Sequence, residues 1–167
     1  MMNGVAMFRL GRRKSQQSVA AAEAEAESME SLVSGHPLRA RVDAMLRAAP
    51  SEIAVRDPDA LDVEGDAADE AVAFEEDVFH IFSAEELDAA QVGYARLESG
   101  ESLVSTAAGA WRPTWLVVGY WTLTGDPILV DLDDESLPVL AAFHGQGSWS
   151  PYVRFPSLEA FLAAGQP

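Results

Sequence analysis

The stretch WLVVGYWTLTGDPILVDLDD, residues 115–134, contains two apolar runs separated by a turn. Residues 115–121 are bulky and β-branched, which is typical of a strand. Residues 124–127, Thr-Gly-Asp-Pro, favour a tight turn, and the alternation of side chains over 128–132 predicts a second strand. The spacing leaves no room for the long crossover that parallel strands need, so the two strands are expected to pair antiparallel.

The same alternation of short runs and turns continues to the C-terminus. Residues 139–143 (VLAAF) and 152–155 (YVRF) predict two further strands of an antiparallel meander. Ser157 then precedes LEAFLAA, and a serine in that position favours the start of a helix.

Two helices and a strand are predicted upstream. Apolar residues in the segment 37–50 recur at spacings of three and four, which indicates a helix that begins at one proline and ends before another. Residues 78–82 (VFHIF) predict a strand, and Ser83 with Glu86 forms a capping box. The helix that follows this box is expected to end near Gly100.

These elements predict an α+β fold with a central, mostly antiparallel sheet flanked by helices. Residues 1–35 combine a basic opening with an alanine-glutamate run and are expected to be a disordered or transiently helical tail. Residues 36–167 are expected to form one domain. Within it, residues 51–74 are expected to be a loop with short strands.

Tryptophan and tyrosine are dense in the predicted sheet, at Trp111, Trp115, Tyr120, Trp121, Trp149 and Tyr152. Most are expected to be packing residues, with Trp149 as the anchor of its loop. Because Trp115 and Trp121 are an even number of residues apart, a regular strand would place both side chains on one face.

The charge of the chain is strongly acidic, with 27 acidic and 11 basic residues and a formal net charge of −16 at pH 7. Residues 57–88 contain 13 carboxylates and no lysine or arginine. Such a surface repels phosphates, which argues against a nucleic-acid partner, and it attracts cationic proteins. Acidity that serves solubility alone is the alternative interpretation.

Cysteine is absent, which excludes disulfides and thiolate metal sites. No apolar run approaches the length of a membrane span, and no apolar region follows the basic start of the chain. We therefore expect a soluble cytoplasmic protein with no membrane partner and no cofactor.

The acidic run DLDDES, residues 131–136, raises the question of a calcium loop. Such a loop needs glycine at its sixth position and glutamate at its twelfth, where this chain has Ser136 and Ala142. The three histidines are also not spaced along the sequence as the histidine ligands of a zinc site usually are. No metal site is predicted.

The loop FHGQGSWSP, residues 143–151, places His144 near Ser148. A serine nucleophile needs a base within hydrogen-bond reach and a third group that orients the base, and no nucleophile-elbow motif surrounds this serine. We therefore predict no catalytic residue. A small hydrolase or ligand-binding domain that uses His144, Asp131 and Ser148 is the alternative.

A family resemblance arises from WLVVGYWTLTGDPILVDLDD, the closing segment PVLAAFHGQGSWSPYVRFPSLEAFLAA and the upstream VFHIFSAEELDAA. Together they resemble the SUKH superfamily of cell-wall-assembly regulators and bacterial immunity proteins, over roughly residues 77–165. The family's opening helix motif has no counterpart in the first third of this chain.

The resemblance implies a SUKH-like α+β domain that binds a protein and is not an enzyme, most often an immunity protein that neutralises a bacterial toxin such as a nuclease. The acidity suits a basic toxin domain as the partner. We expect the partner to contact carboxylates of two segments: Asp66, Asp69, Glu70, Glu75, Glu76, Asp131, Asp133, Asp134 and Glu135. A regulatory scaffold, whose basic residues 9–14 reach an acidic partner, is a third possibility.

Overall fold

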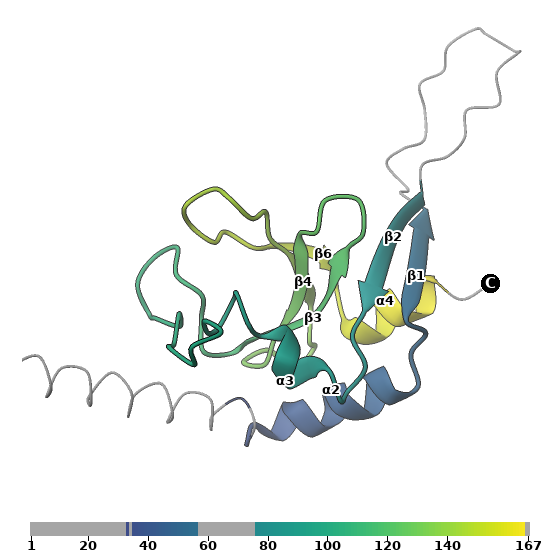
Figure 1. Cartoon of the computed structure of the whole chain (residues 1–167). Coiled ribbons are helices and arrows are strands. Elements are labelled where there is room, and N and C mark those ends of the chain that lie inside the picture. The colour runs from purple at the N-terminus through teal and green to yellow at the C-terminus, as the bar shows by residue number, and fades with distance from the viewer. Residues whose placement is uncertain (1–32, 34, 57–75, 166–167) are drawn as a thin grey trace, which may run out of the picture.

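The computed structural model of the chain describes residues 33, 35–56 and 76–165. Six strands form one sheet in which each strand pairs antiparallel with the next one along the chain. They are β1 (Glu52–Arg56), β2 (Glu76–Ile81), β3 (Trp115–Trp121), β4 (Pro127–Asp131), β5 (Val139–Ala141) and β6 (Tyr152–Phe155). The sheet curls into a half-barrel (Figure 1), and the predicted meander is confirmed.

Within residues 35–56 and 76–165, three helices accompany the sheet: α2 (Pro37–Arg47), α3 (Leu87–Ala90) and α4 (Leu158–Ala164). Both α2 and α4 follow their sequence signals, with Pro37 in the first turn of α2. The hydroxyl of Ser157 accepts a hydrogen bond of 3.0 Å from the amide of Ala160 and so caps α4. The expected tail falls outside the described residues, apart from Val33 and Gly35.

The helix expected between Ser83 and Gly100 is wrong, because α3 is a single turn. One half of the capping box is present, since the Ser83 amide donates to the Glu86 carboxylate at 2.9 Å. The chain then leaves the helix at Gln91, whose side-chain amide donates to the Val117 carbonyl and accepts from the Val117 amide, both at 3.0 Å. These bonds to the sheet outweigh the modest helix propensity of the segment.

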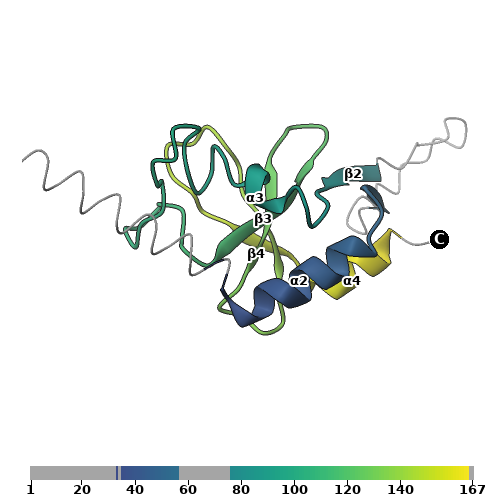
Figure 2. The same ribbon diagram turned by 60° about the horizontal axis from the view of Figure 1, so that its bottom comes forward.

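The two faces of the sheet have separate cores. The concave inner face is covered by α2 and α4, which lie on the same side of the sheet (Figure 2). The inner core includes Val42, Leu46, Ile53, Phe79, Leu116, Val118, Ile128, Val130, Leu158 and Phe161. The outer core is smaller and consists of Trp111, Trp115, Val117, Leu129 and Ala142, with Tyr94, Leu140 and Trp149 packed against it.

The expectation that Trp115 and Trp121 share a face is wrong. Trp115 belongs to the outer core and Trp121 packs against the inner one. The pairing of β3 with β4 shifts between Val117 and Gly119, and this bulge changes which side chains point inward. Gly119 is needed there, because a Cβ atom at this position would lie 2.2 Å from the carbonyl oxygen of His80.

An ion pair joins strands that are not neighbours in the sheet. The guanidinium of Arg154 on β6 pairs with the carboxylate of Asp77 on β2, and their side chains are 28% and 16% exposed. Nearby, Phe161 of α4 packs on Phe79 of β2 and on Phe155 of β6, with ring centroids 5.4 and 4.8 Å apart. The ion pair and the aromatic contacts together hold the curl of the sheet.

Replacing Arg154 with alanine is expected to lower the free energy of unfolding by about 2 kcal/mol, because Asp77 would stay partly buried without its partner. This loss lies between those typical of exposed ion pairs and of buried ion pairs. The double variant Asp77→Leu/Arg154→Met should recover most of this loss. Urea unfolding measures both, with Arg47→Ala on α2 as the control. Equal losses for Arg154→Ala and Arg47→Ala would show that the pair does not hold the curl.

Candidate functional site

The described parts of the two acidic segments predicted to bind a partner lie at opposite ends of the sheet. Antiparallel pairing puts the start of β2 and the β3–β4 and β5–β6 connections at one end and the β4–β5 connection at the other (Figure 1). Glu76 is exposed at the start of β2, opposite Arg56 in the pairing. Asp66, Asp69, Glu70 and Glu75 lie outside the described residues. The described parts of the two segments therefore do not form one site.

Asp131, at the end of β4, holds its own surroundings in place. One carboxylate oxygen accepts the indole N–H of Trp115 at 3.3 Å, and the other accepts the amide of Asp133 at 3.1 Å. The first bond ties the β4–β5 turn to the outer core, and the second begins the turn. Each oxygen retains capacity for a further donor.

The rest of the β4–β5 turn is also fixed by hydrogen bonds. The Asp134 carboxylate accepts the hydroxyl and the amide of Ser136, at 2.6 and 2.9 Å, and these bonds lower the pKa of Asp134. Arg41 of α2 donates to the carbonyl of Glu135 at 3.0 Å. The side chains of Asp133 and Glu135 are exposed. The turn thus holds two outward-facing carboxylates on an ordered backbone.

A groove of about 420 Å³ lies beside Asp131 on the outer face of the sheet. Its walls come from the loop 106–112, the start of β3, and residues 149–151. Trp149 anchors the last of these segments as predicted, because its ring packs edge-on against Trp111 with centroids 5.1 Å apart. The groove escaped sequence analysis, since its walls are brought together only by the fold.

His144 is oriented by a carboxylate that sequence analysis had assigned only to a turn. Its Nδ1 atom lies 2.6 Å from Oδ1 of Asp126, and its amide donates to the same oxygen at 2.9 Å. Asp126 also accepts the hydroxyl of Thr124 at 2.8 Å. The imidazole is 56% exposed and the carboxylate only 9%. When Nδ1 carries the proton and donates to Asp126, Nε2 of this exposed imidazole is left as an acceptor or base.

Within the described residues, neither of the partners expected for His144 in the hydrolase alternative forms a hydrogen bond with it. Asp131 lies at the other end of the sheet. Ser148 instead packs against Gly109, where an added Cβ atom would come within 2.7 Å of the serine Cβ. No hydrogen bond joins Ser148 to His144 within the described ranges. The predicted meander could have identified Asp126 as a partner of His144. In a meander, the β3–β4 turn and the start of the β5–β6 loop lie at the same end of the sheet.

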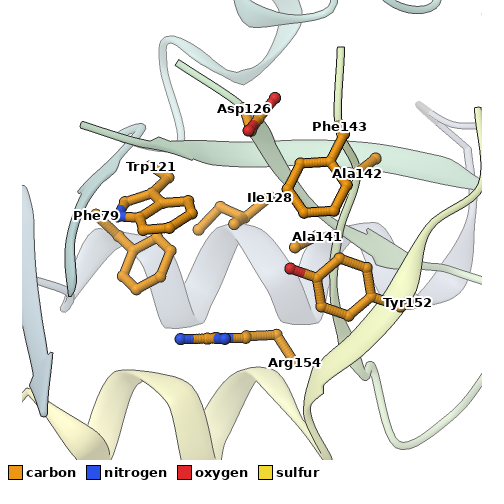
Figure 3. A pocket seen from close by; sticks show the side chains of 9 residues that line it. All are labelled: Phe79, Trp121, Asp126, Ile128, Ala141, Ala142, Phe143, Tyr152 and Arg154. Carbon is orange, nitrogen blue, oxygen red and sulfur yellow. The ribbon is translucent and has the colours of Figure 1, made fainter. Parts of the chain in front are cut away.

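The dyad borders the open mouth of the half-barrel, where a small hollow lies between β2 and β6 (Figure 3). Figure 3 shows the rings of Phe143 and Tyr152 on one side of it and Trp121 on the other. The space inside is about 10 Å³, which suits a single water molecule rather than a ligand.

Among the described residues, no three histidine or carboxylate side chains are grouped as a metal site. None of the helices described is both long enough and apolar enough to cross a bilayer. The chain matched no protein-family model, no curated protein and no solved structure.

The pKa of Asp126 sets a pH dependence. Burial opposes ionisation, but hydrogen bonds from the His144 amide, the Thr124 hydroxyl and the His144 imidazole outweigh it and lower the pKa. A carboxyl whose pKa is lower in the folded state stabilises the fold above its unfolded pKa of about 4, and the effect is lost as the pH falls through the folded pKa.

We therefore expect Asp126→Asn to reduce the free energy of unfolding by about 1–3 kcal/mol at pH 7. The difference from the wild type should shrink as the pH falls below about 4, where the wild-type carboxyl becomes protonated. Urea unfolding at several pH values measures this, with Asp133→Asn as the control. A difference that is independent of pH would contradict the role of the carboxylate charge.

Proposed function

We propose that this chain is a cytoplasmic, non-enzymatic protein-binding domain of the SUKH type. In this proposal it acts as an immunity protein that binds a basic toxin domain, such as a nuclease, and neutralises it stoichiometrically. The proposal extends the α+β architecture to a family assignment that rests on the resemblance of residues 77–165.

The observation that supports the proposal best is the β4–β5 turn. Asp131 and Asp134 use their carboxylates to order the backbone, while Asp133 and Glu135 face solvent. Charged groups on a fixed backbone lose little conformational freedom when they bind, so they favour a specific contact over diffuse attraction. Acidity that served solubility alone would not require an ordered turn.

The overall charge supports the same partner. A net charge of −16 accelerates the encounter with a basic protein and repels nucleic acid, which is the substrate of a nuclease toxin. An acidic inhibitor of this kind can occupy the positively charged surface with which such an enzyme holds phosphates.

Neutralising the two exposed carboxylates of the turn should slow association. A partner is first recovered from the native host with the tagged chain, identified and purified. We expect Asp133→Asn/Glu135→Gln to lower the association rate constant several-fold, on the order of 3- to 10-fold at low salt, and by less at high salt. Stopped-flow fluorescence measures the rate.

The matched control is Glu52→Gln/Glu85→Gln, which changes the net charge equally on exposed residues of β1 and of the turn before α3. If both double variants slow association to the same extent, overall charge is responsible and the β4–β5 turn is not the contact. A rate that does not change with ionic strength would remove electrostatic attraction altogether.

A second candidate function is favoured by the Asp126–His144 dyad. A histidine held at Nδ1 by a buried carboxylate is the arrangement that general bases use, and its Nε2 could act on a water molecule. Among the described residues, no serine or threonine hydroxyl forms a hydrogen bond with Nε2 of His144. The dyad therefore supports acid–base chemistry only in an enzyme that activates water.

One variant separates the two candidates. His144→Ala should leave the affinity for the partner within about twofold of the wild type if the chain is a binding protein. In a hydrolase the same change should lower turnover by a factor of about 10² or more. Hydrolysis of a panel of ester and phosphoester substrates, measured beside partner affinity, decides between them.

A further inference from the structure

The groove on the outer face combines a ligand-sized volume with an unusual set of charges. Its space of about 420 Å³ falls within the range of ligand sites, and it is lined by Arg112, Trp115, Asp131, Leu140, Trp149 and Pro151 among others. These residues come from five separate segments of the chain: the loop 106–112, β3, β4, β5 and residues 149–151. Asp131 is the residue shared by the groove and the acidic β4–β5 turn.

The walls of the groove are joined to one another by hydrogen bonds. The amide of Trp149 donates to the carbonyl of Gly109 at 2.7 Å, which joins the two loops that line the groove. Behind them, the indole N–H of Trp111 donates to the carbonyl of Trp115 at 3.2 Å. A site with walls fixed in this way needs little rearrangement when it is occupied.

The two charged side chains that line the groove, Arg112 and Asp131, differ in the contacts they make. The carbon at the centre of the Arg112 guanidinium lies 5.3 Å from the centroid of the Trp115 ring, a cation–π contact. Within the described part of the chain, Arg112 forms no ion pair. Asp131 has two hydrogen bonds and can accept more, so the groove offers an anionic acceptor beside a stacked cation.

Charge complementarity decides between possible occupants. The groove itself is lined by one carboxylate, that of Asp131, and one guanidinium, that of Arg112. The exposed Asp133 and Glu135 follow Asp131 in the β4–β5 turn and make this part of the chain acidic. A cationic side chain is favoured over an anionic one at this balance, and a second copy of a chain with a charge of −16 would be repelled.

We propose that this groove is the docking site for a cationic segment of the partner protein. A lysine or arginine of that segment pairs with Asp131 and lies along the ring of Trp149, and Arg112 donates to a backbone carbonyl of the same segment. The proposal rests on the proposed function and specifies its contact surface.

The test uses the full chain with ¹⁵N label and its four tryptophan indole N–H signals. The probe is the capped peptide acetyl-Gly-Arg-Gly-amide, whose dissociation constant we expect on the order of 1 mM, since it makes one ion pair and one stacking contact. The indole signals of Trp115 and Trp149 should shift, while that of Trp121 on the inner face should not.

Two matched peptides separate charge from shape. The citrulline analogue keeps the shape of arginine without its charge, and we expect at least fivefold weaker binding. The analogue with glutamate in place of arginine should not bind in the groove. Stronger shifts with the glutamate peptide would overturn the proposal, because Arg112 would then be the anchor of an anionic ligand.

Variants of the chain complete the test. Asp131→Asn keeps an oxygen for the Trp115 indole but removes the charge, so it should weaken arginine-peptide binding at least fivefold, whereas Glu52→Gln should not. Equal binding by both variants, or no shift of Trp115 and Trp149, would overturn the groove as the site. If the arginine peptide binds in the groove but no basic partner is bound by the chain, the proposed function fails instead.

Discussion

The bulge in β3 is the constraint on which the two faces of the sheet depend. By shifting the pairing between Val117 and Gly119, it lets Trp115 pack outward and Trp121 pack inward on a single strand. The outward tryptophan supports the groove beside Asp131, and the inward one lines the mouth of the half-barrel. Gln91 satisfies the backbone groups of Val117 at the bulge, and this same contact ends α3. One local irregularity thus determines the end of a helix and the position of two surfaces.

The two chemically distinct surfaces differ in what they offer a partner. At the mouth, the acid–base dyad of Asp126 and His144 adjoins a hollow with room for one water molecule. At the opposite end, the ordered acidic turn adjoins a groove of ligand size. Because binding strength depends on fixed, complementary groups rather than on total area, the second surface suits capture of a basic protein better than the first.

The strands and the helix ends were predictable because their signals are local. Alternation over 128–132, proline at residue 37 and serine at residue 157 each act on their own turn or strand. The shortness of α3 was not, since it depends on hydrogen bonds between Gln91 and Val117, 26 residues away. The side change at Trp121 was not either, since it depends on a register shift in the pairing of β3 with β4. Likewise, Asp131 could be singled out by its acidic surroundings, but its place in a groove depends on loops that only the fold brings together.

In the proposed function, the chain captures a basic partner through the acidic turn and the groove next to it. Amide hydrogen exchange of the full chain, free and in complex with the purified partner, locates the contact. We expect protection to appear in residues 106–112, 131–136 and 149–151. Protection confined to residues 122–126 and 143–145, around the dyad, would contradict it.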